Sequence, residues 1–138
     1  MTNFQALLIL SKSKQKGTAW ETECVRYLQS YTKHEFMRLP LVGTKDVGDI
    51  RCIDLPEFVF ECKNRKDALS SLSEIMRETE QERVNAEAGF AAAIVKRRNF
   101  GTGGAYVVME LHGFAQLIKE RINGRSNQAE GGTSPSFH

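Results

Sequence analysis

The 138-residue sequence contains no apolar run long enough to cross a membrane, because a membrane-spanning helix needs about 18 or more consecutive apolar residues. A short apolar run near the start is followed by lysines. A secretory signal peptide instead carries its positive charge before the apolar run and a small-residue cleavage site after it. We therefore expect a cytoplasmic protein with no membrane partner.

Cysteine and histidine are both scarce, with three of each. The cysteines Cys24, Cys52 and Cys62 have no CxxC spacing, and the histidines form no HExxH or HxH pattern. A disulfide framework or a zinc site therefore has no support in the spacing, and we expect reduced thiols in the core. Hydrophobic residues at 41% and charged residues at 26% are typical of a globular domain.

The hydrophobic pattern alternates between helical and strand periods, with turn residues between the segments. It predicts helices over 18–31, 67–88 and 113–122, and strands from about 35, from about 48, over 57–63, over 90–95 and over 105–111. Leu55 and Pro56 are expected to form the turn of a hairpin, and Gly89 to end the second helix. This order predicts an α/β domain with one mixed sheet flanked by helices. We expect one domain over 1–123 and a disordered tail over 124–138.

Three residues near the predicted hairpin could carry chemistry. Residues two apart in a strand share a face, so Glu61 and Lys63 should point the same way, with Cys62 on the opposite, core-facing side. Pairing of the strand from about 48 with 57–63 would bring Asp49 close to Glu61. Two converging carboxylates suit Mg²⁺ or Mn²⁺, and a neighbouring lysine can orient water or stabilise charge on a phosphate. The alternative is a surface ion pair of little energetic value.

Positive charge is unevenly distributed although the net charge is only +2. Basic residues form three short clusters that could converge on one face and contact phosphate, or could simply be solvated surface. The candidate DNA-binding residues are Lys12, Lys14, Lys16, Arg65, Lys66, Lys96, Arg97 and Arg98.

These motifs together resemble the PD-(D/E)XK nuclease superfamily, and within it the Holliday junction resolvases of archaeal and phage type. The resemblance spans about residues 14–111, and a chain of phage origin would be expected in the host cytoplasm. "KGTAWETE" is similar to the KGxxxE opening of those resolvases, "VGDI" to their PDI-like motif and "VFECK" to their ExK motif. Residues 78–99 resemble the helix and strand that follow. The superfamily usually has proline where this chain has Gly48.

The resemblance implies a restriction-endonuclease-like core and a Mg²⁺-dependent endodeoxyribonuclease that resolves Holliday junctions by paired nicking as a homodimer, with Mn²⁺ able to substitute. It assigns the metal to Asp49, Glu61 and the backbone carbonyl of Cys62, and catalysis also to Lys63. Glu21 would assist the metal, directly or through water. Alternatively, Glu21 would be structural, completing a capping box with Thr18 as N-cap. Another nuclease of the superfamily, acting in repair, restriction or flap cleavage, and a non-cleaving DNA-binding protein of the same fold remain alternatives.

Overall fold

A computed structural model of the chain describes residues 2–40 and 46–130, with the side chains of 6–15 and 128–130 outside this description. The chain forms two compact units, Met1–Val108 and Met109–His138, and each is described by itself. Within the described residues, no helix is both long and apolar enough to span a membrane.

The first unit contains a five-stranded mixed sheet whose spatial order follows the chain order. Its strands are β1 (Phe36–Arg38), β2 (Ile50–Cys52), β3 (Leu55–Lys63), β4 (Phe90–Val95) and β5 (Tyr106–Val108). The β1–β2, β2–β3 and β4–β5 pairs are antiparallel, whereas β3 and β4 are parallel. A parallel pair needs a crossover connection, and α2 (Leu72–Asn85) provides it. This arrangement confirms the predicted mixed α/β class.

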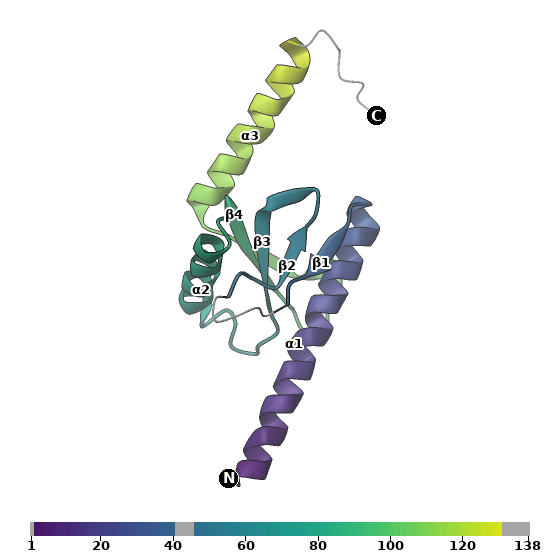
Figure 1. Ribbon diagram of the computed structural model, residues 1–138, viewed down its shortest axis with the longest axis vertical. Helices are drawn as coiled ribbons and strands as arrows, with labels where there is room; N and C mark the ends of the chain where they lie inside the picture. The colour runs from purple at the N-terminus through teal and green to yellow at the C-terminus, as the bar shows by residue number, and fades with distance from the viewer. Residues whose placement is uncertain (1, 41–45, 131–138) are drawn as a thin grey trace. The chain divides into compact units, whose positions relative to one another are not determined.

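The helix α1 (Asn3–Thr32) covers one face of the sheet and α2 covers the other (Figure 1). Trp20 and Cys24 of α1 pack with Ile50 and Ile94 of the sheet. The indole Nε1–H of Trp20 donates to the Ile94 carbonyl at 3.2 Å. On the opposite face, Ile75 of α2 packs with small residues of β4. All six residues of β4 are therefore buried, as in other strands that are covered on both faces.

The start of α1 differs from the prediction. The helix begins at Asn3, and Thr2 is its N-cap, in a capping box with Gln5. Thr18 lies inside the helix, where its carbonyl accepts the Thr22 hydroxyl at 3.0 Å, so the predicted cap at Thr18 is wrong. Gly17 disfavours a helix at this position, but its cost of about 1 kcal/mol relative to alanine is too small to end one.

Several other helix and strand boundaries also differ from the prediction. The β2–β3 turn lies at Ile53 and Asp54, and Leu55 and Pro56 already belong to β3. The helix α2 begins at Leu72 and ends at Asn85. After it, Glu87 adopts the left-handed conformation, with φ 53°, so the predicted stop at Gly89 is wrong. Residues Thr102–Gly104, between the last two strands, form a short 3₁₀-helix.

The second unit contains α3 (Leu111–Glu130). This helix continues past residue 123, where we expected the folded domain to end. Residues 131–138 lie outside the described part of the chain.

Candidate functional site

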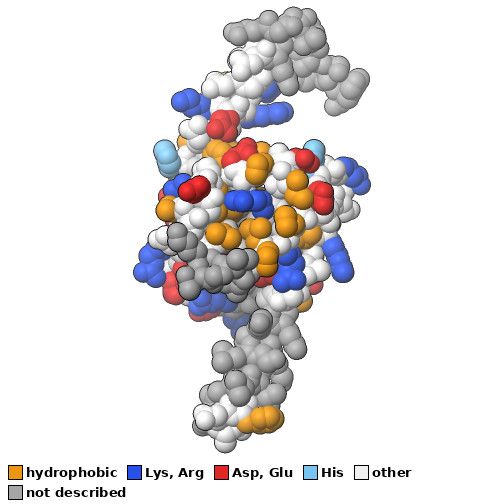
Figure 2. Space-filling model, in the orientation of Figure 1, with side chains coloured by type: hydrophobic (Ala, Val, Ile, Leu, Met, Phe, Trp, Pro, Cys, Tyr) orange, Lys and Arg blue, Asp and Glu red, His pale blue; other side chains and the backbone are white. Residues whose placement is uncertain are grey.

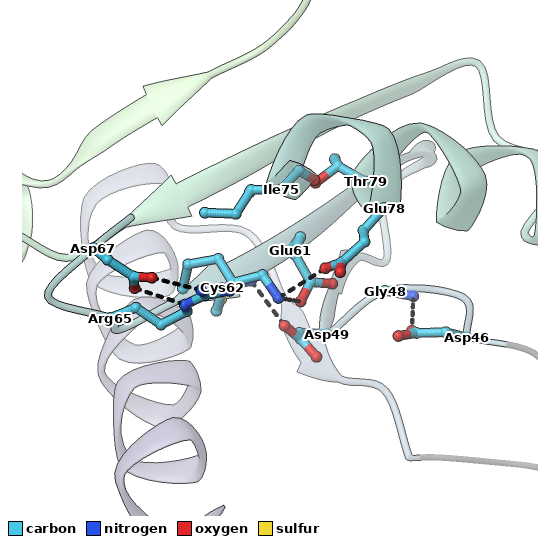
Figure 3. Close-up of polar contacts among 11 residues, drawn as sticks. Asp46, Gly48, Asp49, Glu61, Cys62, Arg65, Asp67, Ile75, Glu78 and Thr79 are labelled. Carbon is cyan, nitrogen blue, oxygen red and sulfur yellow. Dashed lines mark hydrogen bonds and ion pairs between the residues drawn. The ribbon is translucent and has the colours of Figure 1, made fainter. Parts of the chain in front are cut away.

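The β2–β3 hairpin brings Asp49 to the end of β3. The Asp49 N–H donates to the Phe60 carbonyl at 2.9 Å, and a carboxylate oxygen of Asp49 accepts the Cys62 N–H at 2.8 Å (Figure 3). Ile50 pairs with Phe60, so Asp49 takes the position just before the β2 strand. The carboxylate thus replaces a backbone acceptor at the point where the two strands separate.

Glu61 and Lys63 share the face of β3 that α2 covers, as the sequence predicts. Glu61 is only 6% exposed. The Lys63 ammonium lies 3.2 Å from Glu61 Oε1 and 3.3 Å from Glu78 Oε2 on α2. Cys62 faces the opposite way and packs against the α1 cluster, where a hydrogen bond to the Cys24 thiol and burial raise the pKa of Cys62. The Cys62 side chain is therefore a protonated core thiol.

The Cys62 backbone faces the site even though its side chain does not. In an antiparallel pair, a residue directs its N–H and its C=O toward the same neighbouring strand. Because the Cys62 N–H reaches Asp49, its carbonyl faces the same edge of β3. A metal ion bound by Asp49 could use this carbonyl as a further oxygen ligand.

Electrostatics at this site favour a cation. Burial, then the nearby charge of Glu61, raises the pKa of Asp49 from 3.8 to about 8, although the Cys62 N–H acts in the opposite sense. Burial alone would lower the pKa of Lys63, but the Glu61 and Glu78 carboxylates raise it above its ordinary value. Lys63 is therefore a positive charge fixed inside the site rather than a proton acceptor.

Glu21 of α1 lies beside the same site. A cavity of about 420 Å³ is lined by Glu21, Arg38, Asp46 and Asp49, among others. Arg38 holds Glu21 through its Nε at 3.0 Å and a terminal nitrogen at 2.9 Å. Since Thr18 caps no helix, the capping-box role of Glu21 is excluded. The sequence offered no signal for Arg38, which places a cation at the edge of an otherwise acidic cavity.

Two further carboxylates, Asp46 and Glu82, complete an acidic cluster. One oxygen each from Asp46, Glu61 and Glu82 lies within 4.8 Å of the others. Burial, then contact with Glu61, raises the pKa of Glu82 from 4.5 to about 11. Glu82 follows Ile75 and Thr79 along the buried stripe of α2, and their spacing of four and three residues is the helical signal that could have identified it. Gln81, by contrast, is exposed and bonded to Asn85.

A second cavity, of about 330 Å³, gathers basic residues beyond the carboxyl ends of β3 and β4. Its lining includes Arg65, Lys66, Lys96, Arg97 and Arg98. The Arg97 guanidinium is stacked 3.6 Å from the Phe100 ring centre and 4.2 Å from that of Tyr106, and it donates to the Gly104 carbonyl at 3.2 Å. These contacts hold the Arg97 side chain in the wall of the cavity.

The remaining candidate DNA-binding residues belong to α1. Lys16 is exposed next to Gly17, which lines the first cavity. Lys12 and Lys14 belong to the helix, but their side chains lie outside the description. Of the six candidate DNA-binding residues whose side chains are described, five line the second cavity.

Comparisons with family models, curated proteins and solved structures give no match for this chain. The structure itself shows a mixed α/β protein in which Glu61 and Lys63 form a largely buried carboxylate–lysine pair.

Proposed function

We propose that the protein is a metal-dependent endodeoxyribonuclease with a restriction-endonuclease-like core that resolves four-way DNA junctions. One observation carries this proposal. Asp49, Glu61 and Lys63 meet where β2 and β3 separate, and Glu61 Oε2 is buried with no hydrogen-bond partner among the described residues. Buried carboxylate oxygens with unused lone pairs suit a hard divalent cation such as Mg²⁺, for which Mn²⁺ substitutes.

Asp49, Glu61 and the Cys62 carbonyl would hold the cation, with Glu21 assisting directly or through water. A bound cation at such a site lowers the pKa of water and neutralises charge on a phosphoryl oxygen. Lys63 keeps its proton in this environment, so its role is to orient the attacking water and to stabilise negative charge as it develops. The expected products carry a 5′-phosphate and a 3′-hydroxyl.

The second cavity would hold DNA phosphates away from the acidic site. Its arginines and lysines project from the loops that follow β3 and β4. The first of these loops begins directly after Lys63, and the Lys96 N–H at the start of the second donates to the Lys63 carbonyl at 2.9 Å, so a strand bound in the cavity would pass near the reacting phosphate. Contacts to phosphate supply affinity without sequence preference, as a junction-resolving enzyme needs.

A homodimer is part of the proposal, because one site cuts one strand and paired nicks need two sites. An apolar surface is available for association. Met37, Ile53 and Leu55 are 43%, 46% and 42% exposed, and Figure 2 shows apolar side chains gathered over the sheet.

The test compares cleavage of a four-way junction, a flap and a linear duplex of matched sequence in Mg²⁺. We expect paired nicks in the junction, and we expect Asp49→Asn and Glu61→Gln to bind DNA but not cut it. The matched control, Glu74→Gln, changes an exposed carboxylate of α2 and should cut normally.

Each alternative has its own outcome in this assay. Equal cleavage of duplex and junction would contradict junction resolution and favour a general nuclease of the superfamily. Binding without cleavage in either Mg²⁺ or Mn²⁺ would leave a DNA-binding protein. Normal nicking by Asp49→Asn or Glu61→Gln would remove the site assignment.

A further inference from the structure

Asp46, Glu61 and Glu82 come from a loop, a strand and a helix, and their carboxylates meet next to the candidate active site. Asp46 precedes β2, Glu61 lies on β3 and Glu82 lies on α2. Their carboxylate oxygens approach one another within 4.8 Å. Asp49 is not part of this group, so two acidic clusters share Glu61 as their common member.

The buried members of the group have unused oxygen atoms. Glu61 is 6% exposed and Glu82 is 4% exposed. In each of them, Oε2 is shielded from solvent and has no hydrogen-bond partner among the described residues. Lys63 contacts Glu61 only through Oε1. A buried carboxylate oxygen without a partner is costly, so these two atoms mark a place where a positive ligand would be stabilised.

The backbone around Asp46 is held in place for such a ligand. The Asn85 side chain of α2 donates to the Asp46 carbonyl at 2.9 Å, which ties this loop to the helix that carries Glu82. The Gly48 N–H donates to Asp46 Oδ1 at 3.0 Å, as Figure 3 shows. Gly48 also passes close to the cluster, because a Cβ atom there would lie 3.9 Å from Glu82 Oε2.

We propose that Asp46, Glu61 and Glu82 bind a second divalent cation of the Mg²⁺ or Mn²⁺ class, next to the cation on Asp49 and Glu61. The three carboxylates supply the hard oxygen ligands that such ions take. The role of the second ion rests on the proposed function, since paired ions can stabilise both the attacking and the leaving oxygen of a phosphodiester. Its existence does not require DNA cleavage.

A structural role for Glu82 makes a different prediction. If Glu82 only donated a hydrogen bond from a neutral carboxyl group, glutamine would replace it well, because the amide has the same shape and also donates. If Glu82 binds a cation, glutamine loses an anionic ligand and the affinity falls. The substitution Glu82→Gln therefore separates the two roles.

The experiment measures Mn²⁺ binding to the full chain without DNA, by electron paramagnetic resonance of the free ion and by calorimetry, with Mg²⁺ as competitor. We expect two ions per wild-type chain. Glu82→Gln and Asp46→Asn should each weaken one site by roughly tenfold or more, since even outer-shell partners of metal sites are worth that much. Asp49→Asn should weaken the other site, and Glu74→Gln should bind as the wild type does.

Wild-type stoichiometry and affinity in both Glu82→Gln and Asp46→Asn would overturn the inference, as would a single wild-type site that neither substitution affects. Asp46 is exposed, so Asp46→Asn should fold even if Glu82→Gln does not. Cleavage assays judge the proposed function separately. Binding of two ions without DNA cleavage would support the second cation site and contradict the proposed nuclease activity. DNA cleavage together with unaltered ion binding in both variants would contradict only the second cation site.

Discussion

The Asp49 carboxylate accepts the backbone N–H of Cys62 at 2.8 Å, across the gap where β2 and β3 separate. This bond fixes one oxygen of Asp49 on the strand that carries Glu61 and Lys63. The distance between the acidic groups is therefore set by the sheet rather than by flexible side chains. Burial and close spacing of these carboxylates make their ionisation unfavourable without a cation. The stability of the folded protein should therefore depend on pH.

We expect the metal-free protein to lose stability as the pH rises from about 5 to 8. Folding raises the pKa of Asp49 from 3.8 to about 8, so the folded state holds this proton more tightly than the unfolded state does. The resulting stabilisation is complete below the unfolded pKa and is lost as the pH rises through the folded value. Asp67, whose pKa is lowered to about 2 by hydrogen bonds from Arg65 and Ser71, changes stability only below this window.

Melting temperatures in a chelating buffer would measure the effect. Asp49→Asn cannot ionise, so its advantage over the wild type should grow from pH 5 to 8, and saturating Mg²⁺ should reduce that advantage. If the melting temperatures of the two proteins changed with pH in parallel, ionisation of Asp49 would not destabilise the folded state, and the prediction would be wrong.

Lys63→Ala should lower the maximal cleavage rate by roughly 10²–10³-fold, the usual cost of removing a charge-stabilising donor. The affinity for Mn²⁺ should not weaken, because the ammonium is not a ligand and repels cations. A titration of activity with Mn²⁺ separates the two effects. Glu78→Gln is the matched control: it removes the other carboxylate beside Lys63 and should keep most of the rate. A preserved maximum with a shifted midpoint would mean that Lys63 only adjusts the carboxylates.

Gly48→Ala and Gly17→Ala should change stability in opposite directions. Gly48 has φ 98°, and a Cβ atom there would meet the Phe60 carbonyl and Val59 Cβ at 3.4 Å. Alanine in this conformation should cost roughly 1–3 kcal/mol. Gly17 lies inside α1 with nothing within 4 Å of a Cβ atom, so alanine there should stabilise the helix by roughly 0.5–1 kcal/mol. Denaturant unfolding compares them, and two changes of the same sign would contradict the backbone conformation described.

The sequence predicted much of the sheet, because strand signals depend on local alternation and on apolar content. The strand Phe90–Val95 matches its predicted range, and the hairpin placed Asp49 near Glu61 as expected. The start of α1 was missed because Thr2 and Thr18 both begin capping-box patterns. Local sequence cannot tell which threonine actually caps and which lies inside a longer helix.

The site was only half predictable, for a similar reason. Asp49, Glu61 and Lys63 depend on the register of one hairpin, which nearby residues determine. Glu82 depends on how α2 packs over β3, which is a tertiary property. The helix α2 contains several acidic residues, and only the helical spacing of Glu82 from Ile75 indicates that Glu82 is the buried acid. The stacking of Arg97 between two rings likewise needs β5 to pair with β4.

The last prediction concerns the second cavity and the salt dependence of DNA binding. Lys66 and Arg98 are exposed at its lining, whereas Arg65 is held by Asp67 at 2.8 Å and Arg97 is stacked in the wall. Lys66 and Arg98 are thus the side chains most available to phosphate. If each contacts one phosphate, Lys66→Ala and Arg98→Ala should weaken binding and reduce the slope of log affinity against log salt by about 0.9.

Both substitutions should weaken duplex and junction binding by a similar factor, because phosphate contacts carry no sequence information. Arg26→Ala, which removes an exposed cation of α1 that lines neither cavity, is the matched control and should leave the slope unchanged. Fluorescence anisotropy at several salt concentrations would measure all three variants. An equal loss in Arg26→Ala would mean that DNA senses only the total charge of the protein, and unchanged slopes for Lys66→Ala and Arg98→Ala would place the phosphate contacts outside this cavity.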